Sequence, residues 1–342
     1  MPVTYKDSGV DIAKAKRIKE EMKGFIQSTF NKNVALGSGA FGGAFDASEL
    51  KKMKKPVLIS SVDGVGTKTK IAAAMNKWDT IGFDIVNHSA NDIVCIGAKP
   101  LFFFDYIAAA ELKQEVILQV VKGLSAACKE LDMPLVAGET AEMPGVYEKG
   151  ELDLAGSIVG IVEKSRIVDG KKIRKGDVLI GLASDGLNTN GYSLARKVFF
   201  EAAGKKVSDF MPLLGCTVGE ALLVPHKNYS KNVLKLLEKF DLHGIAHITG
   251  GAFHKNIGRL LPKGCGAAVR KSAWEPLPIF KVIQKLGGVP EDDMYHTFNM
   301  GIGMVLIVSK KDAKRISAAL QKLGEKPVEI GEIISGSGVE IN

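Results

Sequence analysis

The sequence predicts an α/β protein of the α+β type with two domains. Its 342 residues are about twice the length of an average domain. Its composition, 46% hydrophobic and 25% charged, is close to the globular average and excludes a wholly disordered chain or a coiled coil. Strand-like apolar runs and helical periodicity alternate along the whole length, which favours sheets covered by helices.

The spacing of apolar residues predicts the individual elements. Apolar residues recur at helical intervals over 12–25, 78–96, 114–131, 192–200, 232–240, 279–286 and 313–323. Apolar runs predict strands over 56–62, 101–107, 135–137, 154–162, 178–183, 267–269, 303–308 and 328–330. The charged segment 163–177 contains two glycines and no apolar run, so we expect the domain boundary there, with domains at 1–168 and 169–342.

The charge balance favours anionic partners. A net charge of +8 is compatible with binding to nucleic acid, a membrane surface or phosphorylated small molecules. The one dense basic run, Lys51, Lys52, Lys54 and Lys55, has no interleaved aromatic residue and is typical of a solvated helix face. We therefore expect a small-molecule partner and no nucleic acid.

The cysteines and apolar runs predict a cytoplasmic protein. The four cysteines lie far apart and form no C-x-x-C pair, which indicates a reducing compartment. Residues 1–6 lack the apolar core of a signal peptide. No apolar run approaches the roughly 20 residues of a membrane span, so we expect no membrane association.

The first chemical motif is a glycine-rich segment at 37–43. Gly37, Gly39, Gly42 and Gly43 would let backbone N–H groups approach a phosphate. The spacing also matches the G-x-G-x-x-G dinucleotide pattern, with Asp63 following at about the usual interval of 20 residues, although only a short apolar run precedes the loop. A phosphate loop, a dinucleotide site and an ordinary glycine loop all remain open.

The second motif, Asp63-Gly64-Val65-Gly66-Thr67-Lys68, follows a predicted strand. A carboxylate suits Mg²⁺, and a lysine with flexible backbone suits polyphosphate. The Walker A spacing is absent, and the alternative is an ordinary Asp-Gly turn. Asp92 lies on the apolar stripe of the predicted helix 78–96, so we expect it to be buried and to need a cation, which a metal shared with Asp63 would supply. A misjudged helix face would leave it solvated instead.

Four further polar motifs are individually weak. An acidic segment with Glu139 follows the strand 135–137, where α/β proteins place ligands. The others are a polar loop with Asn190, the His247-Ile248-Thr249-Gly250-Gly251 segment and the glycine-containing run 298–304. For the acidic segment a surface turn is as likely as a ligand site, and each of the other three alone is more often structural. No Ser-His-Asp or Cys-His order indicates a covalent nucleophile.

Together, in this order along nearly the whole chain, the motifs resemble the AIR (aminoimidazole ribonucleotide) synthase family of purine biosynthesis. The resemblance begins at Tyr5-Lys6-Asp7-Ser8-Gly9-Val10-Asp11 and is most specific at 63–68, 91–93, 138–145, 246–251 and 298–304. It implies ATP-dependent ring closure of formylglycinamidine ribonucleotide, with ATP and Mg²⁺ as cofactors. It also implies a homodimer formed through the N-terminal sheet and a ferredoxin-like core in the C-terminal domain.

The resemblance also implies roles for individual residues. Catalytic residues would be Asp92, His247 and Asn190. Nucleotide-binding residues would be Gly37, Gly39, Gly42, Gly43, Asp63, Gly64, Thr67 and Lys68. The metal would be held by Asp63, Asp92 and Glu139.

Three positions depart from the family pattern. Asn188 stands where a histidine is usual, Ala252 where a third glycine is usual, and Lys99 where an acidic residue is usual. Other readings are a relative such as thiamine-phosphate kinase, an NAD-dependent oxidoreductase and a non-enzymatic anion-binding module. The combination of the segments 138–145 and 298–304 favours the cyclo-ligase reaction among these.

Overall fold

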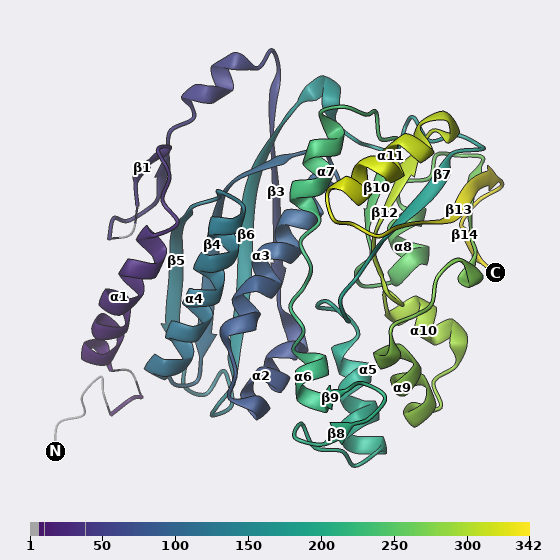
Figure 1. Cartoon of the computed structure of the whole chain (residues 1–342). Helices are drawn as coiled ribbons and strands as arrows, with labels where there is room; N and C mark the ends of the chain where they lie inside the picture. The colour runs from purple at the N-terminus through teal and green to yellow at the C-terminus, as the bar shows by residue number, and fades with distance from the viewer. Residues whose placement is uncertain (1–6, 10, 38) are drawn as a thin grey trace. The chain divides into compact units, whose positions relative to one another are not determined.

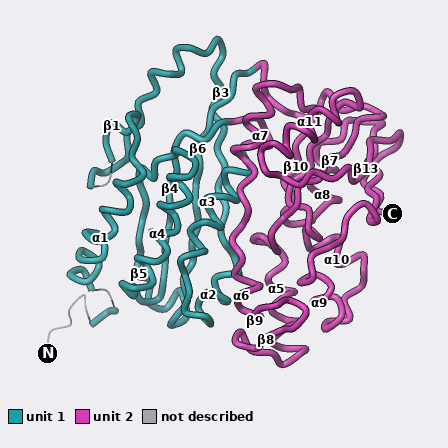
Figure 2. The backbone as a smooth tube through the Cα atoms, viewed as in Figure 1, with its two compact units in different colours: residues 1–93, 99–164 teal, residues 94–98, 165–342 magenta. Residues whose placement is uncertain are grey.

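The computed structural model describes residues 7–9, 11–37 and 39–342, and these fall into two compact units. Unit 1 comprises residues 1–93 and 99–164, and unit 2 comprises residues 94–98 and 165–342 (Figure 2). Residues 1–6 and Val10 of the N-terminal motif and Ser38 of the glycine segment lie outside the described residues. Residues 94–98, which start at the last residue of α3 (Asp79–Val94), group with unit 2.

Unit 1 is built on a mixed four-stranded sheet. Its elements are α1 (Ile12–Gln27), β1 (Val34–Leu36), β2 (Ala44–Phe45), β3 (Pro56–Gly64), α2 (Thr69–Met75), α3 (Asp79–Val94), β4 (Lys99–Ala109), α4 (Gln114–Glu130), β5 (Leu135–Glu142) and β6 (Leu152–Glu163). The strand order is β3-β6-β4-β5, and only β4 and β5 are parallel. The edge strands are therefore β3 and β5.

Helices cover one face of this sheet and leave part of the other exposed. α3 and α4 lie over one face (Figure 1), where Phe103, Ile107 and Ile158 are buried. Gly156 makes this packing possible, because a Cβ there would meet the Phe103 ring at 2.2 Å. On the opposite face, Leu58 and Val62 are 61% and 70% exposed.

Unit 2 contains a six-stranded sheet. Its elements are β7 (Val178–Ala183), α5 (Tyr192–Arg196), β8 (Phe210–Met211), β9 (Cys216–Thr217), α6 (Val218–Leu222), α7 (Ser230–Leu237), β10 (Gly244–His247), α8 (Ala252–Gly258), β11 (Cys265–Val269), α9 (Pro278–Gly287), α10 (Glu291–Thr297), β12 (Ile302–Val308), α11 (Lys310–Lys322), β13 (Pro327–Ser335) and β14 (Val339–Ile341). The order is β10-β12-β7-β13-β11-β14, and the β11–β14 pair is the parallel one.

The core of unit 2 forms where α7 and α11 pack on the sheet. Apolar side chains of β7 and β12 meet those of the two helices, and all are nearly fully buried: Ile180, Leu182, Leu306, Val308, Val233, Leu236, Ile316 and Leu320. β12 is buried along its whole length, as expected for a central strand covered on both faces.

The structure confirms the mixed α/β class and most predicted elements. The helix predicted over 114–131 is α4, and the strand predicted over 178–183 is β7. The helix predicted over 192–200 is α5 only as far as Arg196, and a π-helical turn at Lys197–Ala202 follows. Short elements such as α2, α10, β10 and β14 were not predicted, because they carry too few residues to show a period.

Two motif assignments to loops were wrong. The strand predicted at 135–137 continues to Glu142, because β5 pairs in parallel with β4 as far as Ala109↔Glu142. Glu139 therefore lies within a strand. His247 is the last residue of β10, paired with Met304, and the Thr-Gly segment begins only after it. No helix in the described part of the chain is both long enough and apolar enough to cross a bilayer.

Candidate functional site

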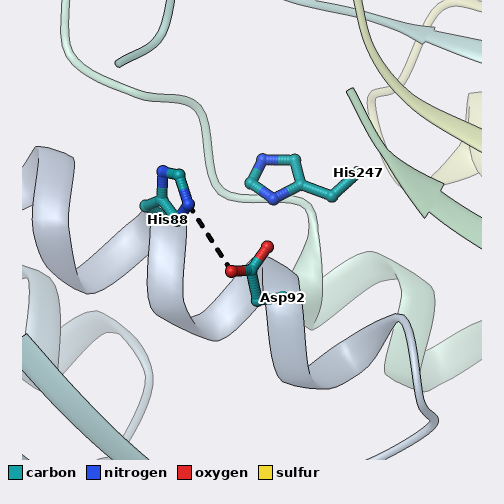
Figure 3. Close-up of side chains that lie close together, drawn as sticks. All are labelled: His88, Asp92 and His247. Atoms are coloured by element: carbon teal, nitrogen blue, oxygen red, sulfur yellow. Dashed lines mark ion pairs between the residues drawn. The ribbon is translucent and has the colours of Figure 1, made fainter. Parts of the chain in front are cut away.

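The end of β3 brings Asp63 to α3 within unit 1. Asp63 pairs with Gly156 of β6, so its side chain points to the face that the helices cover. There Asp63 Oδ2 lies 2.9 Å from His88 Nε2, and Asp92 Oδ2 lies 3.5 Å from the same nitrogen. His88 and Asp92 are one turn apart on α3 and face the same side of it (Figure 3). The predicted pair of carboxylates is thus brought together around an imidazole.

The groups of this cluster stabilise one another's charged forms. The hydrogen bond with His88 lowers the pKa of Asp63, against the effect of its partial burial. Burial alone would lower the pKa of His88, but hydrogen bonds to Asp63 and Asp92 outweigh it and raise the pKa from 6.5 to about 9. In the metal-free protein at neutral pH, His88 is therefore an imidazolium between two carboxylates.

Asp92 is less buried than its position on the helical stripe predicted. Its side chain is 30% exposed, whereas Ile81, Ile85 and Ser89 on the same helix are fully buried. The expectation of a buried carboxylate was wrong because Asp92 lies at the edge of the apolar stripe. The cation that it was expected to need is, in this structure, His88.

The carboxylates fit a hard divalent cation by their chemistry. Asp63 Oδ2 and Asp92 Oδ2 approach one common point, where the imidazolium serves as their positive partner. Carboxylate oxygens are the ligands that Mg²⁺ prefers.

Glu139 lies apart from these two carboxylates. β5 and β3 are opposite edges of the four-stranded sheet, which separates them by roughly 14 Å at about 4.8 Å per strand. Glu139 also pairs with Tyr106, on the face opposite to Asp63. Within one chain, Glu139 and Asp63 therefore cannot share one ion.

The turn after β3 is held by a buried ion pair. Lys68 is fully buried, and its Nζ donates to Asp84 Oδ1 of α3 at 2.8 Å. Burial lowers the pKa of Lys68, and Asp84 opposes this effect. Gly66 has φ +70°, and an added Cβ would meet no atom within 4 Å, so the turn leaves its backbone accessible at that point. The ammonium predicted to touch phosphate is thus buried in this structure, where it fixes the turn to α3.

The glycine segment 37–43 joins β1 to β2, which form an antiparallel pair. The dinucleotide interpretation was wrong, since that site needs a strand, the loop and then a helix. Close packing explains why two of these positions are glycine. A Cβ at Gly37 would meet the Phe30 ring at 2.3 Å, and one at Gly43 would meet Val136 O at 2.6 Å. Gly39 has φ +107°, and Gly42 has open space around its Cα.

In unit 2, the polar motifs meet at one end of the sheet. β7 and β10 both pair antiparallel with β12. They are therefore parallel to each other, and their carboxyl ends lie at the same end of the sheet. The loop after β7 carries Asn190, and β10 ends at His247. The predicted run 298–304 leads into β12, which begins at that same end of the sheet.

A chain of polar contacts links Asn190 to His247. Asn190 Nδ2 lies 3.4 Å from Thr189 Oγ1, which lies 3.2 Å from His226 Nδ1. His226 Nε2 lies 2.9 Å from His247 Nε2, so one ring donates and the other accepts. A Cβ at Gly250 would meet Asn190 Oδ1 at 3.2 Å. Two of the predicted site residues are therefore brought together in unit 2.

The backbone around this polar chain adopts strained conformations. Asn188, Ala252 and Met300 have φ values of +62°, +44° and +49°. Such values favour glycine, and strain of this kind gathers at functional sites. Asn299 fixes the arrangement, because its Oδ1 accepts from Ser184 Oγ at 3.0 Å and its Nδ2 donates to Gly186 O at 2.9 Å.

Sequence reasoning interpreted His88, beside Asp92, as a core histidine and missed His226. His88 has a detectable signal, since it precedes Asp92 by four residues and so shares its side of the helix. His226 lies in an irregular segment before α7 and has no spacing relation to His247. Only the fold brings these two rings together.

Comparisons with known proteins agree over both units. The family model described as AIR synthase related protein, N-terminal domain, matches residues 46–162, and the C-terminal domain model matches 174–342. The phosphoribosylformylglycinamidine cyclo-ligase of Alkaliphilus oremlandii is 48% identical over 337 residues, covering 98% of each chain. That of Acetivibrio thermocellus is 49% identical over 339 residues, covering 99% of each chain.

Solved structures share the fold at low identity. Thiamine-monophosphate kinase from Stenotrophomonas maltophilia K279a has a TM-score of 0.67 and 17% identity, covering 94% of this chain and 95% of that one. The hydrogenase maturation protein HypE in complex with ATP has a TM-score of 0.65 and 17% identity, covering 94% and 86%. The cyclo-ligases match this chain over almost its full length at 48–49% identity, almost three times the identity of these structures. Among proteins of this fold, the sequence is therefore most similar to the cyclo-ligases. The chain therefore belongs to the phosphoribosylformylglycinamidine cyclo-ligase family of AIR synthase related proteins.

Proposed function

We infer that this chain catalyses the reaction for which its family is named. It closes formylglycinamidine ribonucleotide to aminoimidazole ribonucleotide with ATP, releasing ADP and phosphate, in de novo purine biosynthesis. It is an enzyme, a ligase that forms a carbon–nitrogen bond. Nearly half of the residues are identical to those of the cyclo-ligases over almost the full length of the chain. This similarity supports the cyclo-ligase function over that of a kinase or a non-enzymatic anion-binding module.

The reaction needs charge neutralisation more than a covalent nucleophile. The amide oxygen of the substrate is a poor leaving group, so ATP phosphorylates it and ADP leaves. An internal nitrogen then attacks the imidate carbon, and the oxygen departs with phosphate. Positioning and electrostatic stabilisation supply most of the catalysis in phosphoryl transfer. Carboxylates, backbone N–H groups and polar side chains are sufficient for this purpose.

We assign ATP and Mg²⁺ to unit 1. The observation that carries this assignment is the convergence of Asp63 and Asp92 beside the glycine-containing turn. Asp63 and Asp92 would hold Mg²⁺, which neutralises phosphate charge when bound. Gly64 and Thr67 lie one and four residues after Asp63 and would contact phosphate, with Lys68 anchoring the turn through Asp84. The segment containing Gly37, Gly39, Gly42 and Gly43 would add backbone N–H groups.

We assign the substrate to unit 2. Asn190 and His247 offer donors and acceptors at one edge of its sheet, suited to the amide and amidine groups of formylglycinamidine ribonucleotide. His226 would orient His247 through the contact between their Nε2 atoms, and Thr189 would orient His226. Asn188 stands where a histidine is usual in the family. Because an amide does not titrate, Asn188 would not act as an acid or a base in this site.

We propose that the chain forms a homodimer through the sheet of unit 1. Leu58 and Val62 of β3 and Tyr106 of β4 are exposed and share the face that the helices leave uncovered. Phe102 and Phe104 lie on the same face with ring centroids 5.3 Å apart. An apolar sheet face of this extent in a single chain favours a second copy as its cover. Glu139 lies on this face, so a role for it in metal binding would involve the dimer.

The finer domain assignments remain part of this proposal. Residues 1–168 would form the ATP-binding and dimerisation domain, and residues 169–342 the AIR-synthase-type domain. β7, β10, β12 and β13 would form a ferredoxin-like core with α7 and α11, which the order β10-β12-β7-β13 supports. A cytoplasmic location would follow from the pathway.

The direct test is formation of aminoimidazole ribonucleotide by the purified protein with ATP and Mg²⁺. We expect ADP release that depends on formylglycinamidine ribonucleotide. Equal ADP release without that substrate, or with thiamine phosphate in its place, would overturn the proposed function.

A further inference from the structure

A polar cavity of about 320 Å³ lies in unit 2, at the end of the sheet opposite to the Asn190–His247 chain. Its walls are formed by Lys172, Arg174, Asp241, His243, Ser309, Lys311 and Asp312. β10 begins directly after His243 and ends at His247, so roughly 13 Å of strand separates the two histidines at about 3.3 Å per residue. The cavity is therefore distinct from the site assigned to the substrate.

A buried imidazole forms part of the cavity wall. His243 is only 8% exposed, and its Nδ1 lies 2.6 Å from Asp177 Oδ2. Because a carboxylate can only accept, Nδ1 carries the proton of this hydrogen bond. Asp177 is itself held by the backbone N–H of Arg174 at 3.0 Å. The ring is thus fixed by one nitrogen, and Nε2 is the nitrogen left to serve a ligand.

The charges around the cavity do not cancel. Asp241 is paired with Lys172 at 2.6 Å, and Asp312 is paired with Arg315 at 3.0 Å. Among the residues that the structure describes, no carboxylate lies within ion-pairing distance of Arg174 or Lys311. The wall beside His243 therefore carries three cations, Lys172, Arg174 and Lys311, against two carboxylates, and the charge of Lys311 acts on Asp312.

The start of α11 adds to this positive potential. Ser309 precedes the helix, but its Oγ donates to Asp312 Oδ2 at 2.7 Å and does not cap a backbone N–H group. The N–H groups of Asp312 and Ala313 donate to Ser309 O at 3.0 and 3.1 Å, and the helix dipole favours an anion near this end of the helix. The buried histidine, the excess of cations and the helix terminus all favour an anion as the ligand.

We propose that this cavity binds the phosphoryl group of a small molecule. Arg174 and Lys311 would form charge-assisted hydrogen bonds with the phosphoryl oxygens, and the Nε2 atom of His243, whose ring Asp177 holds in place, would face them. The volume is near the lower limit for small-molecule sites and suits a ligand between inorganic phosphate and a sugar phosphate. Such ligands are available to this enzyme, since phosphate is its product and its substrate carries a ribose phosphate.

Calorimetric titration of the full-length protein tests the proposal with inorganic phosphate, ribose 5-phosphate and ribose. We expect both phosphorylated probes to bind and ribose not to bind. The double variant Arg174→Gln/Lys311→Gln should lower the affinity at least about tenfold, while turnover at saturating substrate stays unchanged. Lys310→Gln is the matched control, because Lys310 is an exposed neighbour on α11 that does not line the cavity. Tighter binding of ribose 5-phosphate would identify a sugar phosphate as the ligand, and equal binding would identify phosphate.

The position of the anion gives a second readout. Crystals soaked in tungstate, an oxyanion with a strong anomalous signal, should show density within hydrogen-bonding distance of His243 Nε2. Density only elsewhere would overturn the proposal. So would equal phosphate affinity in the wild type and the double variant, or an equal loss in Lys310→Gln.

Discussion

The polar cluster of unit 1 and that of unit 2 differ in how they are held. In unit 1, Asp63, His88 and Asp92 form a cluster of opposite charges, in which carboxylates raise the pKa of the imidazole to about 9. In unit 2, Thr189, Asn190, His226 and His247 are joined by hydroxyl, amide and imidazole contacts. A charged cluster suits metal and phosphate, whereas a chain of dipoles suits orientation of a substrate. The difference predicts that substitutions in the two clusters will have separable effects.

The largest effect is expected at the charged cluster. Asp63→Asn keeps the shape of the side chain and removes its charge, so kcat/KM should fall at least about 100-fold with the fold intact. Product formation across a Mg²⁺ titration measures this. Asp132→Asn is the control, because Asp132 is an exposed acid at φ +51°, where asparagine is well tolerated. Unchanged Mg²⁺ dependence in Asp63→Asn would mean that Asp63 is only a turn residue.

The charged cluster should also make stability depend on pH. Since the pKa of His88 is raised from 6.5 to about 9 by folding, its stabilisation is complete below about pH 6.5 and is lost as the pH rises through about 9. The shift corresponds to roughly 3 kcal/mol of unfolding free energy in the metal-free protein. Urea unfolding with a chelator, compared between wild type and His88→Gln, isolates this contribution. The same pH dependence in both proteins would contradict the charged cluster.

A smaller and different effect is expected in unit 2. His226→Asn should lower kcat about tenfold while the KM for ATP stays constant, because His226 positions His247 and lies outside the assigned nucleotide site. His296→Asn is a suitable control, since His296 is exposed on α10. A raised KM for ATP with normal kcat would place His226 with the nucleotide and remove the distinction between the clusters.

The smallest expected effect concerns backbone strain beside the unit 2 cluster. Ala252 has φ +44°, so Ala252→Gly should raise the unfolding free energy by about 1 kcal/mol. Ala126→Gly, in the regular helix α4, should instead lower it by about 1 kcal/mol. Equal and opposite shifts in denaturant midpoint would confirm the strain. Destabilisation by both substitutions would show that Ala252 is not strained.

The sequence was sufficient where chemistry or period is local. Helix α4 and strand β7 were predicted close to their observed bounds, because each carries a full apolar pattern. The association of Asp63 with Asp92 was also predicted, because a carboxylate on the apolar stripe of the helix was expected to need a positive partner, although the burial expected of Asp92 was wrong.

The sequence alone did not predict the position of site residues where that position depends on strand order or on contacts between distant segments. Glu139 was grouped with Asp63 because both follow apolar strands, but β3 and β5 prove to be opposite edges of one sheet. His226 and His247 are 21 residues apart without any spacing signal, and they meet only because the segment before α7 folds back towards β10. Asp92 was expected to need a cation, for which a metal shared with Asp63 was the candidate, whereas His88 on the same helix already supplies positive charge.

The most direct test of the assignment is Mg²⁺-dependent ATP binding by the wild type, Asp92→Asn and His226→Asn, measured by calorimetry without the second substrate. Asp92→Asn should weaken Mg²⁺-dependent ATP binding at least about tenfold, because it removes one of two carboxylates that approach a common point. His226→Asn should bind within about twofold of the wild type. Weakened ATP binding in His226→Asn together with normal binding in Asp92→Asn would contradict the assignment of the nucleotide to the charged cluster of unit 1.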